Sequence, residues 1–163
     1  MQQQSHETNR TFFLAESFVN YTSRNIFLTG KAGTGKTTFL RHIVATTPKK
    51  VAVAAPTGIA AINAEGMTLH SLFQLPFGPF IPDHGQSSAD ANTKSSMLSK
   101  MRINTAKRKL IRGLELLIID EISMVRADML DAVDAVLRFI RKRNHEPFGG
   151  LQVLMIGDLF QYL

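Results

Sequence analysis

The chain has 163 residues, 44% of them hydrophobic, and a formal net charge of +6 at pH 7. This length favours a single domain with a real core and leaves no room for a second full domain. The sequence has no cysteine, which excludes disulfides and cysteine-based metal sites. It shows neither a signal-like N-terminus nor an apolar run long enough for a bilayer, so we expect no membrane partner and a cytoplasmic setting, associated with the nucleoid if the source is bacterial.

The first segment is polar and rich in glutamine, and we predict a disordered tail over residues 1–8. Apolar residues then recur with mostly helical spacing, which predicts a helix from about Asn9 to Thr22. The short apolar run from Asn25 to Thr29 is β-prone and predicts the first strand.

Residues 30–37 match the phosphate-loop pattern G-x-x-x-x-G-K-[ST] at every fixed position. Backbone N–H groups must wrap a triphosphate at contact distance, and a Cβ at the glycine positions would obstruct the loop. We expect Lys36 to reach the β- and γ-phosphates, and the Thr37 hydroxyl to ligate Mg²⁺ at the start of a helix. The residues expected to bind the nucleotide are Gly30, Ala32, Gly33, Thr34, Gly35, Lys36, Thr37 and Thr38.

A fully apolar strand is predicted over residues 51–55, as is typical of a parallel sheet covered on both faces. Pro56 ends this strand and Thr57 can cap a helix. Residues 66–73 predict a second loop and a short helix, and the proline-containing stretch of residues 74–96 predicts an irregular excursion from the sheet. A helix is expected over residues 97–114, with a break near Asn104.

Two groups of basic residues stand out in the second half of the chain. One is Lys94, Lys100, Arg102, Lys107, Arg108, Lys109 and Arg112, and the other is Arg138, Arg141, Lys142 and Arg143. A polyanionic partner would explain them, and so would solvated helix faces with favourable charges near helix C-termini. The sequence leaves both interpretations open.

The apolar run at residues 116–119 predicts a buried strand that delivers Asp120 and Glu121 at its carboxyl end. This is a Walker B arrangement, in which Asp120 would hold Mg²⁺ and Glu121 would orient or deprotonate the attacking water. Residues 123–144 predict a long helix, and residues 151–156 predict the last strand.

Five segments resemble, in order, the first five motifs of Pif-type DNA helicases, which are superfamily-one enzymes that translocate 5′ to 3′ on single-stranded DNA with ATP. The segments are Gly30 to Thr38, Ala55 to Ala61, Thr68 to Phe73, Asp120 to Met124 and Gly157 to Gln161. The resemblance implies an α/β fold of the RecA-like phosphate-loop NTPase type, with a mainly parallel sheet and helices on both faces. It implies ATP and Mg²⁺ as cofactors, and a role in DNA repair, recombination or genome maintenance, telomere maintenance included.

The resemblance also implies individual roles. The catalytic residues would be Lys36, Asp120, Glu121 and Gln161, with Gln161 sensing the γ-phosphate from a strand between the loop strand and the Walker B strand. The metal ligands would be Thr37 and Asp120. The path of single-stranded DNA would be lined by Pro56, Thr57, Gly58, Thr68 and His70.

By the same resemblance, residues 9–163 form the first RecA-like ATPase domain, truncated after the Gly157 to Gln161 motif. The second such domain is absent from the sequence. We therefore expect a monomer that cannot unwind DNA by itself. Two alternatives are a stand-alone nucleotide-binding module and an inert helicase remnant.

Overall fold

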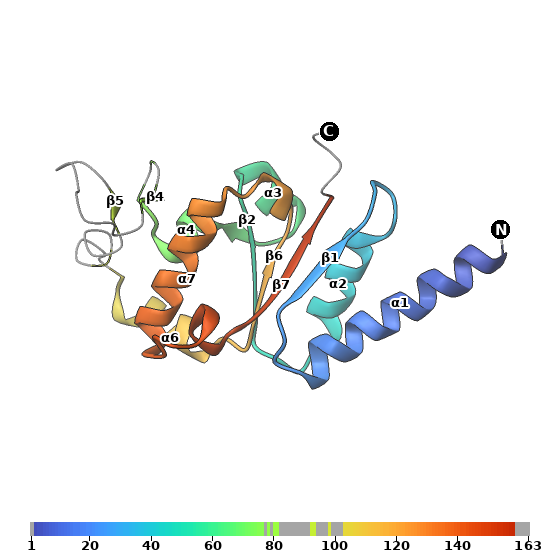
Figure 1. The fold of residues 1–163 in the computed structure, drawn as a ribbon, viewed down its shortest axis with the longest axis horizontal. Helices are drawn as coiled ribbons and strands as arrows, with labels where there is room; N and C mark the ends of the chain where they lie inside the picture. The colour runs from blue at the N-terminus through green and yellow to red at the C-terminus, as the bar shows by residue number, and fades with distance from the viewer. Residues whose placement is uncertain are drawn as a thin grey trace.

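Five parallel strands form the central sheet of the computed structural model, which describes residues 2–76, 78, 80–81, 92–93, 98 and 103–158 (Figure 1). The strand order is β1-β7-β6-β2-β3. The strands are β1 (Ile26–Thr29), β2 (Val51–Ala55), β3 (Met67–Thr68), β6 (Leu116–Ile119) and β7 (Gln152–Gly157). A separate parallel pair joins β4 (Phe80–Ile81) to β5 (Asn92–Thr93).

Helical segments connect the consecutive strands of the central sheet, because parallel strands cannot be joined by a tight turn. The α-helices are α1 (Gln2–Tyr21), α2 (Lys36–Thr46), α3 (Gly58–Asn63), α4 (Leu69–Phe73), α6 (Thr105–Gly113) and α7 (Ala127–Arg141). Two short 3₁₀ turns are η1 (Ile122–Met124) and η2 (Pro147–Gly150). None of the helices in the described ranges is both long and apolar enough to cross a bilayer.

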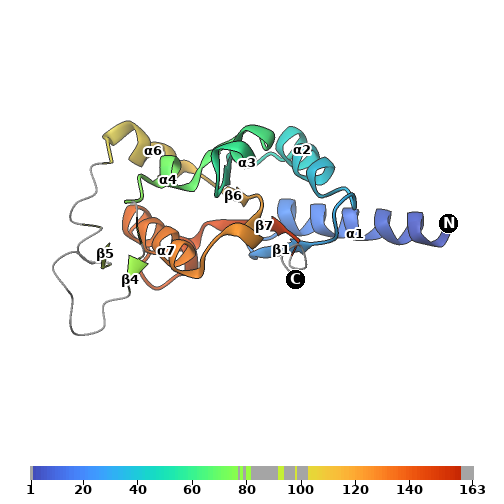
Figure 2. The same ribbon diagram turned by 90° about the horizontal axis from the view of Figure 1, so that it is seen from above.

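The sheet has a hydrophobic core on each face, which confirms the predicted α/β fold with helices on both sides (Figure 2). Side chains of α1 and α2, among them Val19 and Phe39, pack on Leu116 and Ile118 of β6. Side chains of α4, α6 and α7 pack on the alternate residues of the same strand, Leu117 and Ile119. Adjacent residues of a strand point to opposite faces, so a fully apolar β6 serves both cores.

The predicted strands agree with the structure to within a residue, but two helices differ. In the structure α1 begins at Gln2, so residues 2–8 are helical, whereas the sequence predicted a disordered tail there. These residues contain neither Pro nor Gly, and Gln and Glu are well tolerated in helices.

The single long helix predicted over residues 123–144 is wrong. Glu121 has a φ of 51° and Arg126 is extended, so η1 comes first and α7 begins at Ala127.

Asn104 is the N-cap of α6, where its Oδ1 accepts from the Lys107 N–H at 2.8 Å, in agreement with the predicted break. Most of the excursion predicted over residues 74–96 lies outside the described residues.

Lys49 links the amino-terminal edge of the sheet to the end of α1 by hydrogen bonds. Its Nζ donates to Val19 O, to Thr22 O at 2.7 Å and to Oε1 of the buried Gln152 at 2.6 Å. The Gln152 amide in turn donates to Arg24 O at 2.8 Å. Burial lowers the pKa of the Lys49 ammonium. This network holds the segment that leads into β1 and thereby the phosphate loop that follows β1.

Candidate nucleotide-binding site

The phosphate loop joins the carboxyl end of β1 to the N-terminus of α2. Gly35 caps α2 with a φ of 92°, a left-handed conformation that residues with a Cβ rarely adopt. A Cβ on Gly30 would lie only 2.6 Å from Thr34 Oγ1, which itself donates to Lys31 O at 2.8 Å. The glycines therefore allow a tight loop whose N–H groups precede a helix N-terminus, the arrangement that binds anions.

Lys36, the first residue of α2, lies over this loop. Its Nζ donates to Gly30 O at 2.6 Å and to Lys31 O at 3.0 Å. These two hydrogen bonds hold the ammonium against the loop. A bound phosphate would replace them as the acceptor.

Asp120 and Glu121 follow β6, which is separated from β1 only by β7. Burial raises the pKa of the Asp120 carboxyl, while the N–H of Glu121 and the positive charge of Lys36 act in the opposite direction. Glu121 is one of few non-glycine residues with positive φ, at 51°. Such backbone strain clusters at functional sites, and here it turns the chain away from the strand direction and into η1.

A cavity of about 390 Å³ lies between the phosphate loop and the residue Glu121 that follows β6. It is lined by Ala32, Gly33, Gly35, Lys36, Thr37, Thr38, Glu121 and Asp158. The structure thus brings Glu121 to the phosphate loop across the sheet, as the sequence predicted. Asp158, which lies in the Gly157 to Gln161 motif, is 8% exposed and contributes to the lining; its place directly after β7 is the sequence signal for it. Gln161 lies outside the described residues.

The donor set at this site fits a hard cation. Thr37 offers a hydroxyl oxygen in the cavity, and Asp120 offers a carboxylate that is within electrostatic reach of Lys36. No cluster of three or more His, Asp or Glu that could hold a metal occurs in the ranges that the structure describes. Mg²⁺ needs no such cluster, because it binds through one or two protein oxygens, waters and substrate phosphates.

The residues predicted to line a DNA path gather on the neighbouring strand ends. Thr57 follows β2 and caps α3, its Oγ1 accepting from Ala60 N–H at 3.2 Å. Thr68 ends β3 and caps α4, its Oγ1 accepting from Ser71 N–H at 3.1 Å. Ala55 and Thr68 are paired across β2 and β3, which brings Pro56 and Gly58 to the same edge of the sheet as His70.

A smaller cavity of about 40 Å³ lies beside this edge, between His70, Phe80 and the N-terminal turn of α7. At its rim the Arg126 guanidinium binds Asp128 with two bonds of 2.9 and 3.0 Å, and Asp128 accepts from Phe80 N–H at 3.0 Å. Sequence reasoning did not find this contact, because its partners are 48 residues apart.

The parallel sheet, the glycine loop before α2 and the carboxylates after β6 define a RecA-like phosphate-loop NTPase. The model of the PIF1-like helicase family matches residues 3–163, and the chain belongs to that family.

Curated relatives include the ATP-dependent DNA helicase PIF1 of Saccharomyces cerevisiae (strain YJM789), 39% identical over 142 residues, which cover 84% of this chain and 15% of that protein. The ATP-dependent DNA helicase Pif1 of Psychrobacter sp. (strain PRwf-1) is 39% identical over 143 residues, which cover 86% of this chain and 20% of that protein.

Among solved structures, Bacteroides sp Pif1 in complex with ADP-AlF4 is 48% identical with a TM-score of 0.75, and the match covers 95% of this chain and 32% of that one. Bacteroides Pif1 bound to ssDNA is 47% identical with the same TM-score and coverage. The chain therefore spans between one seventh and one third of the length of these relatives.

Proposed function

We propose that this chain is the ATP-binding and hydrolysing motor domain of an ATP-dependent DNA helicase that acts on single-stranded DNA. The observation that carries the proposal is the single cavity into which Lys36, Thr37 and Glu121 converge, beside the strand ends that bear Thr57 and Thr68. The family's relatives are named ATP-dependent DNA helicases. We further propose a role in DNA repair, recombination or genome maintenance, telomere maintenance included, in the cytoplasm or nucleoid.

In this proposal Lys36 exchanges its bonds to Gly30 O and Lys31 O for the β- and γ-phosphates of ATP. Thr37 and Asp120 would hold Mg²⁺, which would neutralise charge on the phosphates.

Glu121 is the residue we assign to the attacking water. Glu121 lines the cavity and is the N-cap of the 3₁₀ turn η1. A carboxylate at hydrogen-bond reach of water can orient it and accept its proton as the bond to the γ-phosphorus forms. We assign detection of the γ-phosphate to Gln161, because it is the last residue of the Gly157 to Gln161 segment that resembles a family motif.

We assign the DNA contacts to Pro56, Thr57, Gly58, Thr68 and His70. Both threonine hydroxyls accept from helix N–H groups, so each still has its own proton to donate to a phosphate oxygen. Contacts of this kind bind backbone and carry no base information, which suits an enzyme that moves along any sequence.

The experiment compares the unmodified chain with Glu121→Gln, and uses Glu65→Gln as the control because Glu65 is an exposed carboxylate outside the cavity. Binding of a fluorescent ATP analogue and single-turnover hydrolysis of Mg-ATP are measured with and without oligothymidine. We expect Glu121→Gln to bind within about twofold of the unmodified chain and to hydrolyse about 10²-fold or more slowly.

The same titrations separate the alternatives. A stand-alone nucleotide-binding module would bind the analogue and ignore single-stranded DNA, and an inert remnant would bind neither. Equal hydrolysis by the unmodified chain and Glu121→Gln would remove Glu121 from the mechanism.

A further inference from the structure

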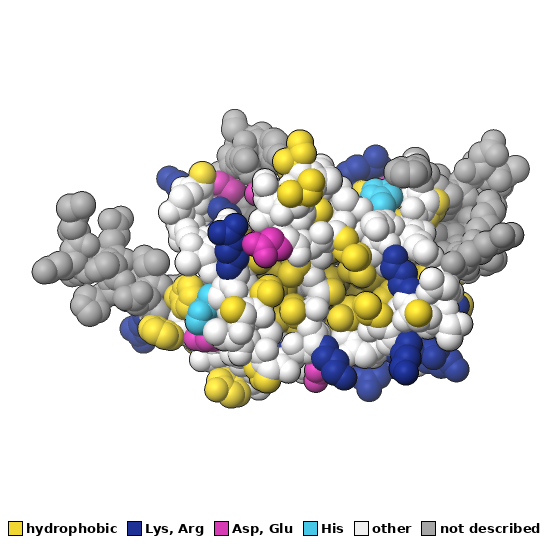
Figure 3. Space-filling model, turned by 180° about the vertical axis from the view of Figure 1, so that it is seen from behind, with side chains coloured by type: hydrophobic (Ala, Val, Ile, Leu, Met, Phe, Trp, Pro, Cys, Tyr) yellow, Lys and Arg dark blue, Asp and Glu magenta, His cyan; other side chains and the backbone are white. Residues whose placement is uncertain are grey.

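α6 and the C-terminal end of α7 present one continuous basic surface. We call it the basic surface and define it by Arg108, Lys109, Arg112, Arg141 and Lys142. Figure 3 shows dark-blue side chains gathered along the lower edge of the molecule, on the side where α6 lies. α6 carries four basic residues and no acidic one.

The two helices that form this surface are fixed to each other. The Arg108 guanidinium lies 5.8 Å from the centre of the Phe139 ring, and Arg112 Nε donates to Ile140 O at 2.8 Å. Arg141 Nη1 donates to Leu114 O at 2.9 Å and to Arg112 O at 3.2 Å. The spacing of the cations is therefore set by the fold and not by the free motion of long side chains.

These contacts hold the guanidinium groups without neutralising them, because the acceptors are carbonyl oxygens and a ring. In the described part of the chain, no ion pair involves any of the five residues. Of the acidic side chains nearby, Asp134 pairs with Arg138, Glu146 pairs with Arg143, and Glu115 accepts from Lys50 N–H. Burial lowers the pKa of Arg141, the neighbouring Arg143 charge lowers it further, and the Glu146 charge acts in the opposite direction.

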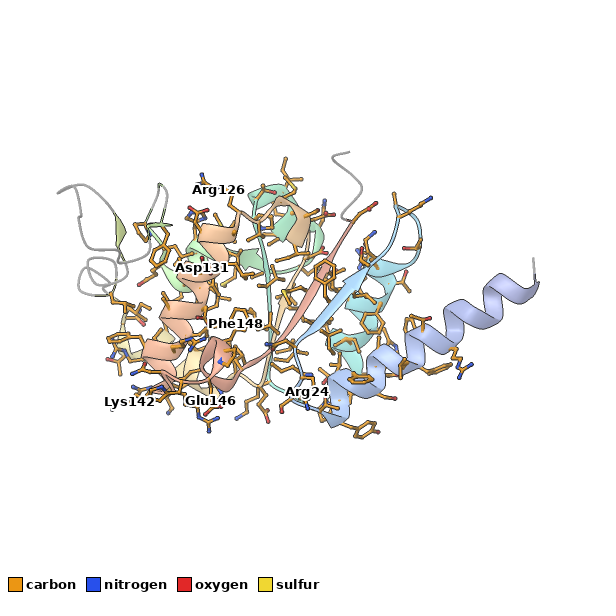
Figure 4. All side chains as sticks on the ribbon, viewed as in Figure 1. Arg24, Arg126, Asp131, Lys142, Glu146 and Phe148 are labelled. Carbon is orange, nitrogen blue, oxygen red and sulfur yellow. The ribbon has the colours of Figure 1, made fainter. Side chains whose placement is uncertain are left out.

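The basic surface lies at the opposite end of the sheet from the nucleotide cavity. α6 leads into the amino end of β6, whereas Glu121 follows its carboxyl end. Figure 4 shows the same separation along α7, with Arg126 at one end of the helix and Lys142 at the other. Lys107, in the first turn of α6, donates to Ser71 O beside Thr68 and is not counted in the basic surface, whose five residues lie further along α6 and at the end of α7.

We infer that the basic surface binds the phosphate backbone of duplex DNA. Cations held at fixed spacing and in no ion pair match a regular polyanion and release its counterions on binding. Proteins that bind single-stranded DNA combine a basic groove along the backbone with exposed rings on which the bases stack. The ring within this surface, Phe139, is 43% exposed and has the Arg108 guanidinium 5.8 Å from its centre, so the five cations outnumber the one ring and the surface offers mainly phosphate contacts. This inference goes beyond the proposed function, since it needs neither nucleotide nor hydrolysis.

The test removes two charges that take part in no ion pair, in the double variant Lys109→Gln/Lys142→Gln. Both side chains are exposed, so the fold should be retained. The matched control, Arg10→Gln/Arg41→Gln, lowers the net charge equally from α1 and α2. Fluorescence anisotropy of a labelled 20-base-pair blunt duplex is measured between about 50 and 200 mM salt, the range over which phosphate contacts change affinity most.

We expect the test variant to reduce the slope of log K against log salt by about two and to weaken duplex binding several-fold at about 100 mM salt. The control should keep the slope of the unmodified chain, and binding of 20-nucleotide oligothymidine should change by less than about twofold in the test variant. Binding of the fluorescent ATP analogue should be unchanged in both.

Three results would overturn the inference. They are an unmodified chain with no salt-dependent duplex binding, an equal loss of duplex binding in the control, and tighter binding of polyglutamate than of the duplex at the same surface. None of these results bears on nucleotide binding, so failure here is distinguishable from failure of the proposed function.

Discussion

The ammonium of Lys36 donates to the main-chain oxygen of Gly30 at 2.6 Å, so the loop holds its own cation through a carbonyl of its first glycine. The same ammonium bonds Lys31 O at 3.0 Å. A triphosphate competes for this group with neutral acceptors, and a charged acceptor forms the stronger bond.

Lys36→Ala should therefore abolish most nucleotide affinity while leaving the fold intact. We expect binding of Mg-ATP to weaken by about 10-fold or more, the equivalent of one charge-assisted hydrogen bond. Isothermal titration calorimetry with a non-hydrolysable ATP analogue measures this change in affinity. The adjacent Lys31→Ala is the control, because Lys31 is exposed and the cavity is lined without it. Unchanged affinity of Lys36→Ala would refute the assigned site.

Asp120→Asn should stabilise the chain without nucleotide at neutral pH. Burial raises the folded-state pKa of Asp120 above its ordinary value of 3.8, so the native state holds this proton more tightly than the unfolded state does. The contribution of Asp120 to stability is thus fully present below pH 3.8 and is lost as pH rises through the folded pKa.

Urea unfolding between about pH 4 and pH 8 tests this, since the gain from Asp120→Asn should grow with pH over that window. The substitution should also reduce the stabilisation given by Mg-ATP, because a metal ligand is lost. Asp131→Asn, at an exposed carboxylate of α7, is the control. A gain that is the same at every pH would contradict the role of ionisation.

Gly157→Ala should disturb the turn that follows Glu121. A Cβ at Gly157 would lie 2.8 Å from Ile122 Cγ2 and 3.1 Å from Ser123 N, so η1 would have to shift. We expect a loss of about 1–3 kcal/mol in the free energy of unfolding, and a larger fall in ATP hydrolysis than in ATP binding. Gly113→Ala is the matched control, since its Cβ would have no atom within 4 Å. Equal hydrolysis by both variants would show that η1 adapts.

Lys49→Met should loosen α1 from the sheet. It removes the donor to Val19 O, Thr22 O and Gln152 Oε1 and leaves these oxygens short of a partner. We expect a loss of about 2 kcal/mol, within the range for hydrogen bonds to charged groups. Lys50→Met is the control, and as an exposed substitution it should stay within about 0.5 kcal/mol. Denaturant unfolding compares the two, and equal stabilities would show that the network contributes nothing net.

The sequence by itself determined the parts of this protein that depend on neighbours along the chain. The glycine spacing before Lys36 requires a loop that a Cβ would obstruct, and the runs Val51–Ala55 and Leu116–Ile119 are strands with the predicted bounds. A short apolar run between turn signals is local information, so it can be read without the fold.

Only the tertiary structure decided which of these parts meet. β3 is two residues long and carries no periodicity; it is a strand because Met67 and Thr68 pair with Ala54 and Ala55. The contacts of Lys49 with Gln152, and of Asp128 with Phe80 N–H, join residues 103 and 48 positions apart. Strand order brought Glu121 and Lys36 into the lining of one cavity. These relationships follow from packing two helical layers on one sheet, and no local pattern encodes them.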